Sequence, residues 1–165
     1  MSIQDKTHRL TATDFLVVTN QPENANRILE LIDGEIAEKV PSFTPSRISS
    51  RISYFITEYN LKHGDLGYIT GEAGGYVLGE GNVFNPDVAY ISKVRLPEIP
   101  EREAPIPPDF AVEIKSRTDS KRALRRKVEH YLNSGTLLVW LVFPDEQIVE
   151  VYVPDQDVQQ VRAGR

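Results

Sequence analysis

One short segment of the chain carries an acid and a base two residues apart. Residues 109–115 read DFAVEIK, and the alternation of a β-strand directs Ala111, Glu113 and Lys115 to one face of it. An isolated ExK in a strand is most often a cross-strand ion pair on a solvated surface. Here the flanking segments are apolar and predict an internal strand, where charges are costly unless they serve a function. Glu113 and Lys115 are therefore candidate site residues.

The segment after this strand is predicted to form a helix over residues 120–133, closed by Ser134-Gly135. Lys127 lies three residues after Leu124 and four before Tyr131, hence on or beside the apolar stripe of that helix. A lysine at the edge of the core that extends to solvent is an equally good interpretation. The helix also presents a basic surface, which is either an ordinary solvated face or a DNA contact. Its members are Lys121, Arg122, Arg125 and Arg126.

The remaining elements suggest an α/β fold with a mixed sheet and flanking helices. Asp33-Gly34 is a dipeptide suited to a two-residue β-hairpin loop, and the run LLVWLVF is typical of a central strand covered on both faces. The predicted order is an N-terminal hairpin over 27–40, a helix over 45–62, short strands over 67–92, a proline-rich loop over 93–108, then strand, helix and two strands. We expect one domain over residues 27–153, preceded by an N-terminal segment (1–26) and followed by a polar, frayed tail (154–165).

Composition sets limits on the class of protein. The chain has 165 residues, 40% hydrophobic and 26% charged, which are the values of a folded domain. It has no cysteine, which excludes disulfides and thiolate metal sites and suits a reducing cytoplasm. No apolar run is long enough to cross a bilayer, so we expect a cytoplasmic protein with no membrane partner. The net charge of −5 argues mildly against a dedicated nucleic-acid binder, although binding depends on local patches.

A longer pattern resembles a known family. The strings ELIDGE, NPDVAYIS, PPDFAVEIKSRTDS and VWLVFPD occur in this order, with a helix containing K…Y…G before the last. This pattern, over about residues 29–153, resembles the Uma-type restriction endonuclease domain family of the PD-(D/E)XK nuclease superfamily. The resemblance implies an αβββαβ core, DNA as the substrate and Mg²⁺ or Mn²⁺ as the cofactor. It places Lys127 at the family's helix-lysine position and implies an additional upstream acid, which Glu30, Glu35 or Glu72 could supply.

The aspartate of the motif has to be chosen among four Pro-Asp pairs. Asp109 is four residues from Glu113 on the same strand, about 13 Å away and too far to share one ion. Asp145 and Asp155 follow the ExK, on the wrong side for the motif. Asp87 precedes Glu113 by 26 residues, far enough for the two strands to lie side by side. Asp87 is therefore the predicted partner of Glu113.

The resulting set predicts phosphodiester hydrolysis. The carboxylates of Asp87 and Glu113 with the backbone carbonyl of Ile114 supply the hard oxygen ligands that Mg²⁺ prefers. Lys115, kept protonated by nearby carboxylates, would orient the attacking water and stabilise developing negative charge. We expect that removing Lys115 abolishes catalysis and spares metal binding.

Two other classes of function stay open. The first is a catalytically silent protein of the same fold that binds nucleic acid or protein, although the set of Asp87, Glu113 and Lys115 is complete. The second is a carboxylate hydrolase that uses Glu113 and another acid as a general acid/base pair, which the adjacent lysine and basic helix disfavour. The sequence contains no separate DNA-recognition module, so strong sequence specificity would require a homodimer or a partner.

Overall fold

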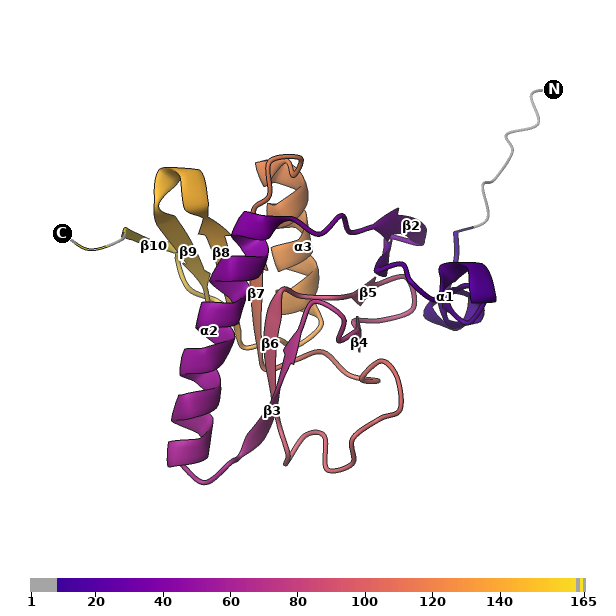
Figure 1. Ribbon diagram of the computed structural model, residues 1–165, viewed down its shortest axis with the longest axis horizontal. Helices are drawn as coiled ribbons and strands as arrows, with labels where there is room; N and C mark the ends of the chain where they lie inside the picture. Colours follow the sequence, from indigo (N-terminus) through magenta and orange to yellow (C-terminus); the bar gives the residue numbers. More distant parts are fainter. Residues whose placement is uncertain (1–8, 163, 165) are drawn as a thin grey trace.

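The DFAVEIK segment forms the central strand β7 (Phe110–Ile114) of a six-stranded mixed sheet, and Lys115 follows its last residue (Figure 1). The computed structural model describes residues 9–162 and 164. The strand order is β10-β9-β8-β7-β6-β3, and β7 runs parallel to β8 and antiparallel to β6. The other strands of this sheet are β3 (Gly67–Gly71), β6 (Val88–Ser92), β8 (Leu138–Phe143), β9 (Ile148–Tyr152) and β10 (Gln159–Arg162).

Helices α2 (Phe43–Lys62) and α3 (Lys121–Asn133) cover opposite faces of this sheet (Figure 1). On the α2 side, the isoleucines at helical spacing pack against Val112 and Ile114 of β7. On the α3 side, Leu124, Val128 and Tyr131 pack against residues that include Ala111. Alternate residues of β7 thus enter different cores, as the strand parity of the sequence predicts. Glu113 belongs to the α3 side, together with Ala111.

The local sequence accounts for the position of α3. Ser120 is its N-cap, and its hydroxyl accepts a hydrogen bond of 3.0 Å from the backbone N–H of Ala123. The helix ends at Asn133, with Gly135 in the left-handed region (φ +105°) just beyond it. Helix α3 therefore directs its buried side chains against β7 and β8, the two strands that it connects.

A second, smaller sheet lies beside the first, with the strand order β2-β1-β5-β4. The predicted hairpin is confirmed: β1 (Leu29–Ile32) and β2 (Glu35–Glu38) pair through the turn at Asp33-Gly34, where both residues have positive φ. Strands β4 (Tyr76–Val77) and β5 (Val83–Phe84) complete this sheet. Helix α1 (Ala12–Thr19) buries Phe15 in a small core with Leu29, Leu31 and Val83.

The predicted fold class is confirmed. Along the chain, α2, β3, β6, β7, α3 and β8 form an αβββαβ sequence of elements, with β4 and β5 inserted between β3 and β6. No helix in the described part of the chain is long and apolar enough to cross a membrane.

Ordered structure continues on both sides of the predicted 27–153 segment. Helix α1 precedes it, and a short 3-10 helix (Pro22–Asn24) follows α1. The prediction of a frayed tail after Pro154 is wrong for residues 159–162, because β10 pairs antiparallel with β9 along its whole length. All four residues of β10 are exposed, so the strand is held by backbone hydrogen bonds and carries no burial pattern that a sequence could reveal.

Candidate active site

Asp87 and Glu113 lie at adjacent positions on neighbouring strands. Val88 pairs with Val112 in the antiparallel β6–β7 ladder, so continuing the register by one residue brings Asp87 opposite Glu113. The backbone N–H of Ile114 donates a 2.7 Å hydrogen bond to Asp87 Oδ2, which fixes this carboxylate against β7. Cross-strand neighbours on one face have Cβ atoms about 4.5–5.5 Å apart. The two acids predicted from the motif are therefore neighbours in the fold.

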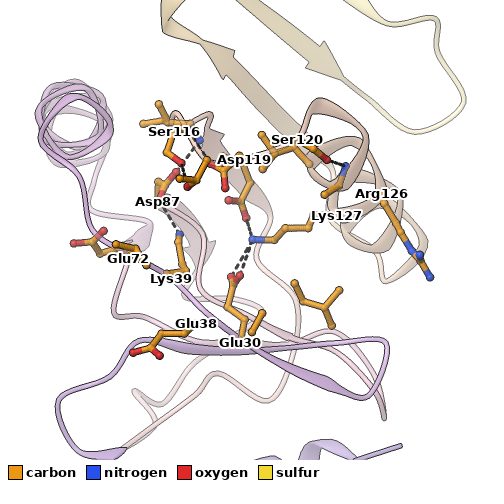
Figure 2. Close-up of a pocket in the computed structure, with 18 of the residues that line it drawn as sticks. Glu30, Glu38, Lys39, Glu72, Asp87, Ser116, Asp119, Ser120, Arg126 and Lys127 are labelled. Carbon is orange, nitrogen blue, oxygen red and sulfur yellow. Dashed lines mark hydrogen bonds and ion pairs between the residues drawn. The ribbon is translucent and has the colours of Figure 1, made fainter.

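Lys127 extends from α3 into the same site. Its Nζ lies 2.7 Å from Glu113 Oε1 and 2.9 Å from Glu30 Oε1, and the lysine is 7% exposed. Figure 2 shows this side chain pointing from the helix toward Glu30. The same oxygen, Glu30 Oε1, accepts a 2.8 Å hydrogen bond from the backbone N–H of Asn85. Three segments distant in sequence thus meet at one ammonium group.

Two further side chains contact the predicted acids. The hydroxyl of Tyr131, one helical turn after Lys127, donates a 2.8 Å hydrogen bond to Glu113 Oε1. Lys39, just after β2, places its Nζ 2.7 Å from Asp87 Oδ1 (Figure 2). The same Nζ donates to the backbone carbonyl of Asn85 at 2.7 Å. Each acid of the motif therefore has a lysine ion pair.

The charges at the site perturb one another strongly. Burial raises the pKa of Asp87, and the negative charge of Glu113 raises it further, against the opposite effect of Lys39. Burial also acts to raise the pKa of Glu113, but the positive charges of Lys127 and Lys39 outweigh it and lower that pKa. Burial would lower the pKa of Lys127, but Glu113 and Glu30 raise it instead. Glu113 is therefore ionised beside a protonated Lys127, and Asp87 takes up a proton more readily than an ordinary aspartate.

These groups line one open cavity of about 680 Å³. The hairpin β1–β2, the segment that leads into α2, the end of β7 and the start of α3 form its walls. Basic side chains also line it, among them Arg9, Arg122 and Arg126. Asp87 and Glu113, the two acids of the motif, line this cavity, although they are only 8% and 2% exposed.

Lys115 does not share the contacts of Glu113. It follows the last residue of β7, and its Nζ donates a 2.8 Å hydrogen bond to the backbone carbonyl of Ser116. Within the described chain, the lysines in contact with the carboxylates of Asp87 and Glu113 are Lys39 and Lys127. The catalytic role predicted for Lys115 remains a prediction.

The structure distinguishes among the three candidate upstream acids. All three line the cavity, but Glu30 is buried and pairs with Lys127, whereas Glu35 is exposed and Glu72 is half-buried. Asp109, which the distance argument excludes, lies at the opposite end of β7 and pairs with Arg95 at 2.5 Å.

The four basic residues of α3 that were predicted to contact DNA lie in different surroundings. Arg122 and Arg126 line the cavity, and Arg126 also pairs with Asp33 at 2.8 Å. Lys121 pairs with Glu146 at 2.6 Å, and Arg125 pairs with the buried carboxylate of Glu150 at 2.6 Å. Only Arg122 and Arg126 of this set therefore face the site.

Asp87 and Glu113 are neighbouring carboxylates that could hold one hard divalent cation. Mg²⁺ is commonly held by one or two carboxylates, with water in its other positions. Asp87, Glu113 and Ile114 all line the cavity. The hydrogen bonds that reach Glu113 in the described structure go to Oε1, leaving Oε2 for another ligand. Over the described residues, no group of three or more histidine, aspartate and glutamate side chains forms a ready-made metal site.

Sequence reasoning missed Lys39 as a site residue and placed Tyr131 only in the apolar stripe of α3. Lys39 contacts Asp87 across 48 residues of sequence, and no periodic pattern marks it. Tyr131 did carry a signal, since it lies one turn beyond Lys127 on the helix face that covers β7.

Comparison with known proteins agrees with this fold. A model of the family described as "Putative restriction endonuclease", Uma2, matches residues 12–164. A crystal structure described as a "putative nuclease belonging to DUF820" from Anabaena variabilis ATCC 29413 is similar, with a TM-score of 0.79 and 26% identity. The match covers 93% of this chain and 85% of that one. A search of curated proteins finds no match. Since the family model spans nearly the whole chain, the protein belongs to the Uma2 family of restriction-endonuclease-like nucleases.

Proposed function

We propose that this protein is a divalent-metal-dependent endonuclease that hydrolyses phosphodiester bonds of DNA. The observation that supports it best is the pairing of Asp87 and Glu113 on adjacent strands at an open cavity. The pKa of Asp87 is raised and that of its buried neighbour Glu113 is lowered, and such opposite shifts in two adjacent carboxylates are typical of a functional site. Family membership supports the reaction class, a nuclease acting on nucleic acid.

Asp87, Glu113 and the carbonyl of Ile114 would hold Mg²⁺ or Mn²⁺. The ion would act as a Lewis acid that activates water and neutralises charge on the phosphate. The chain's contribution is to orient the ligands. The N–H of Ile114 fixes one oxygen of Asp87, and the hydroxyl of Tyr131 fixes one oxygen of Glu113.

The lysine that serves the reacting phosphate is, in our proposal, Lys127. Its ammonium is held by Glu113 and Glu30 and stays protonated, so it acts by charge and not as a base. Lys115, the lysine of the ExK motif, is the other candidate for this role. Its amine is bound to a backbone carbonyl and would have to reorient to reach the site. Glu30 is the upstream acid, and it acts through Lys127.

The substrate is a polyanion, and the basic side chains at the cavity suit its phosphates. Arg9, Arg122 and Arg126 line the wall around the two acids. Acidic side chains outnumber basic ones on the same wall, so these arginines reduce the negative charge there and do not reverse it.

The test is a titration of Mg²⁺ and Mn²⁺ into wild type and Asp87→Ala, with degradation of single- and double-stranded DNA followed in parallel. We expect metal-dependent cleavage by wild type and none by Asp87→Ala, while Asp109→Ala should cleave DNA like wild type. Cleavage by Asp87→Ala at the wild-type rate would refute the assignment.

A second candidate function is a nucleic-acid-binding protein of the same fold that does not cleave. One observation favours it: each acid of the motif is neutralised by a lysine, Asp87 by Lys39 and Glu113 by Lys127. DNA binding that is independent of metal, with no cleavage in either metal, would establish this function instead.

A further inference from the structure

Lys39 holds an unusual place for a surface lysine. It lies in the segment between β2 and α2, outside regular structure, yet its side chain is only 20% exposed. Its Nζ is 2.7 Å from Asp87 Oδ1 and 2.7 Å from the carbonyl oxygen of Asn85. The ammonium therefore binds Oδ1 of Asp87, the oxygen that accepts no hydrogen bond from the backbone of β7.

A cation bound at Asp87 Oδ1 would compete directly with this ammonium. The other oxygen, Oδ2, already accepts the N–H of Ile114. The ammonium of Lys39 thus occupies the oxygen of Asp87 that a metal ion would need. Two like charges a few ångströms apart repel each other strongly in a partly buried site.

The balance of charges at the site also favours the withdrawal of Lys39 when a divalent ion binds. Three carboxylates (Glu30, Asp87 and Glu113) face two ammonium groups (Lys39 and Lys127), which leaves one negative charge. Addition of a divalent ion with both lysines in place reverses that charge to positive. Addition of the same ion with Lys39 withdrawn brings the site to neutrality.

The two lysines differ in how firmly they are held. Lys127 is fixed in α3, 7% exposed, and its amine contacts two carboxylates. Lys39 has one carboxylate partner, lies outside regular structure and has a side chain that is 20% exposed, and both lysines line the 680 Å³ cavity. A lysine stem is flexible, so the amine of Lys39 has room to move into that cavity. Of the two lysines, Lys39 is therefore the one whose amine can move away from its carboxylate partner.

We propose that Lys39 is a built-in counter-ion that occupies Asp87 in the metal-free protein and withdraws when a divalent cation binds. Lys39 then sets the metal concentration at which the site fills. It is a positioning residue, because it acts through Asp87. This inference rests on the proposed function, in which Asp87 is a metal ligand.

The experiment is calorimetric titration of Mn²⁺ into the full chain of wild type, Lys39→Met, Lys39→Arg and Asp87→Asn. Methionine keeps much of the apolar stem and removes the charge. We expect Lys39→Met to bind Mn²⁺ about tenfold more tightly, because one competing positive charge is gone. Lys39→Arg keeps the charge and should bind Mn²⁺ about as wild type does. Lys62→Met, which removes an exposed lysine of α2, is the matched control and should leave the affinity unchanged.

A second readout separates competition from a merely structural role. Without metal, Lys39→Met should unfold at a lower temperature than wild type, since Asp87 loses its ion pair. Saturating Mn²⁺ should therefore raise the melting temperature of Lys39→Met by more than it raises that of wild type. A purely structural lysine would lower the stability and leave the affinity for Mn²⁺ unchanged.

The outcomes for the metal site and for Lys39 are distinguishable. If wild type binds Mn²⁺ and Asp87→Asn does not, an equal or weaker affinity in Lys39→Met overturns the role of Lys39 alone. If wild type and Lys39→Met both fail to bind, or if Asp87→Asn binds like wild type, the proposed metal site fails and this inference fails with it.

Discussion

The amine of Lys127 lies between two acids from different sheets, 2.7 Å from Glu113 of β7 and 2.9 Å from Glu30 of β1. These two ion pairs join the hairpin of the small sheet to the central strand of the large one. The lysine comes from α3, so the site depends on the relative positions of three elements. The two acids keep Lys127 charged, which its proposed role requires.

Lys127→Met should abolish most cleavage while Lys115→Met retains more of it. Loss of a group that stabilises transition-state charge typically costs about 10²–10³ in rate. Metal-dependent DNA cleavage by the two variants at equal protein concentration is the measurement. Breaking a buried ion pair also costs about 3–5 kcal/mol of stability, so the assay must be run where Lys127→Met is folded by circular dichroism. If Lys115→Met is inactive and Lys127→Met is active, then Lys115 is the lysine that stabilises charge on the reacting phosphate.

Tyr131→Phe should lower the free energy of unfolding by about 1–3 kcal/mol, because Glu113 loses a buried hydrogen-bond donor. Urea denaturation of the metal-free protein measures this change. Tyr54→Phe, at an exposed position of α2, is the control and should match wild type. Equal stability of Tyr131→Phe and wild type would contradict the hydrogen bond to Glu113.

Arg122→Ala should weaken DNA binding and reduce its dependence on salt. Arg122 is exposed and lines the cavity, where its positive charge can neutralise one phosphate of the bound DNA. Removing that charge should lower the slope of log K against log salt by about one. Binding to a labelled duplex and to a single strand at several salt concentrations is the measurement. Lys62→Ala, on α2, is the control, and identical slopes for both variants would place the DNA elsewhere.

Acid should destabilise the fold partly through Glu150. The hydrogen bond from Arg125 lowers the pKa of Glu150, against the effect of burial. A carboxylate with a lowered folded-state pKa contributes stability above its unfolded value, and this contribution is lost as the pH falls through the folded value. Compared with wild type, Arg125→Met should have a lower free energy of unfolding at pH 7, and it should lose less of it as the pH falls below about 4.5. Urea midpoints from pH 7 to pH 3 measure it, and parallel curves for the two proteins would contradict this role.

Local patterns predicted most of the fold. Strand parity placed Ala111 and Glu113 on one face of β7, which α3 covers in the structure. The spacing of Lys127 placed it on or beside the apolar stripe of that helix, and the structure buries it. The hairpin followed from Asp33-Gly34, whose residues both adopt positive φ. Each of these predictions rests on residues a few positions apart, where the geometry of the chain fixes which side chains can meet.

The remainder of the site depends on contacts that no local pattern encodes. Lys39 meets Asp87 across 48 residues, and Lys127 meets Glu30 across 97. Lys115 shares the strand parity of Glu113, but β7 ends at Ile114 and the lysine then turns to the carbonyl of Ser116. Parity gives the face on which a side chain starts but not the partner that the end of a flexible lysine reaches, so the motif alone could not assign the lysine.

The proposed function depends above all on Asp87 and Glu113 holding one divalent cation together. Anomalous diffraction from crystals grown with Mn²⁺ is the sharpest test, because the ion can be located without reference to activity. We expect a single Mn²⁺ peak about 2.1 Å from a carboxylate oxygen of each residue, with the amine of Lys39 moved away from Asp87. A peak at other residues, or no peak at saturating Mn²⁺, would contradict the shared metal site.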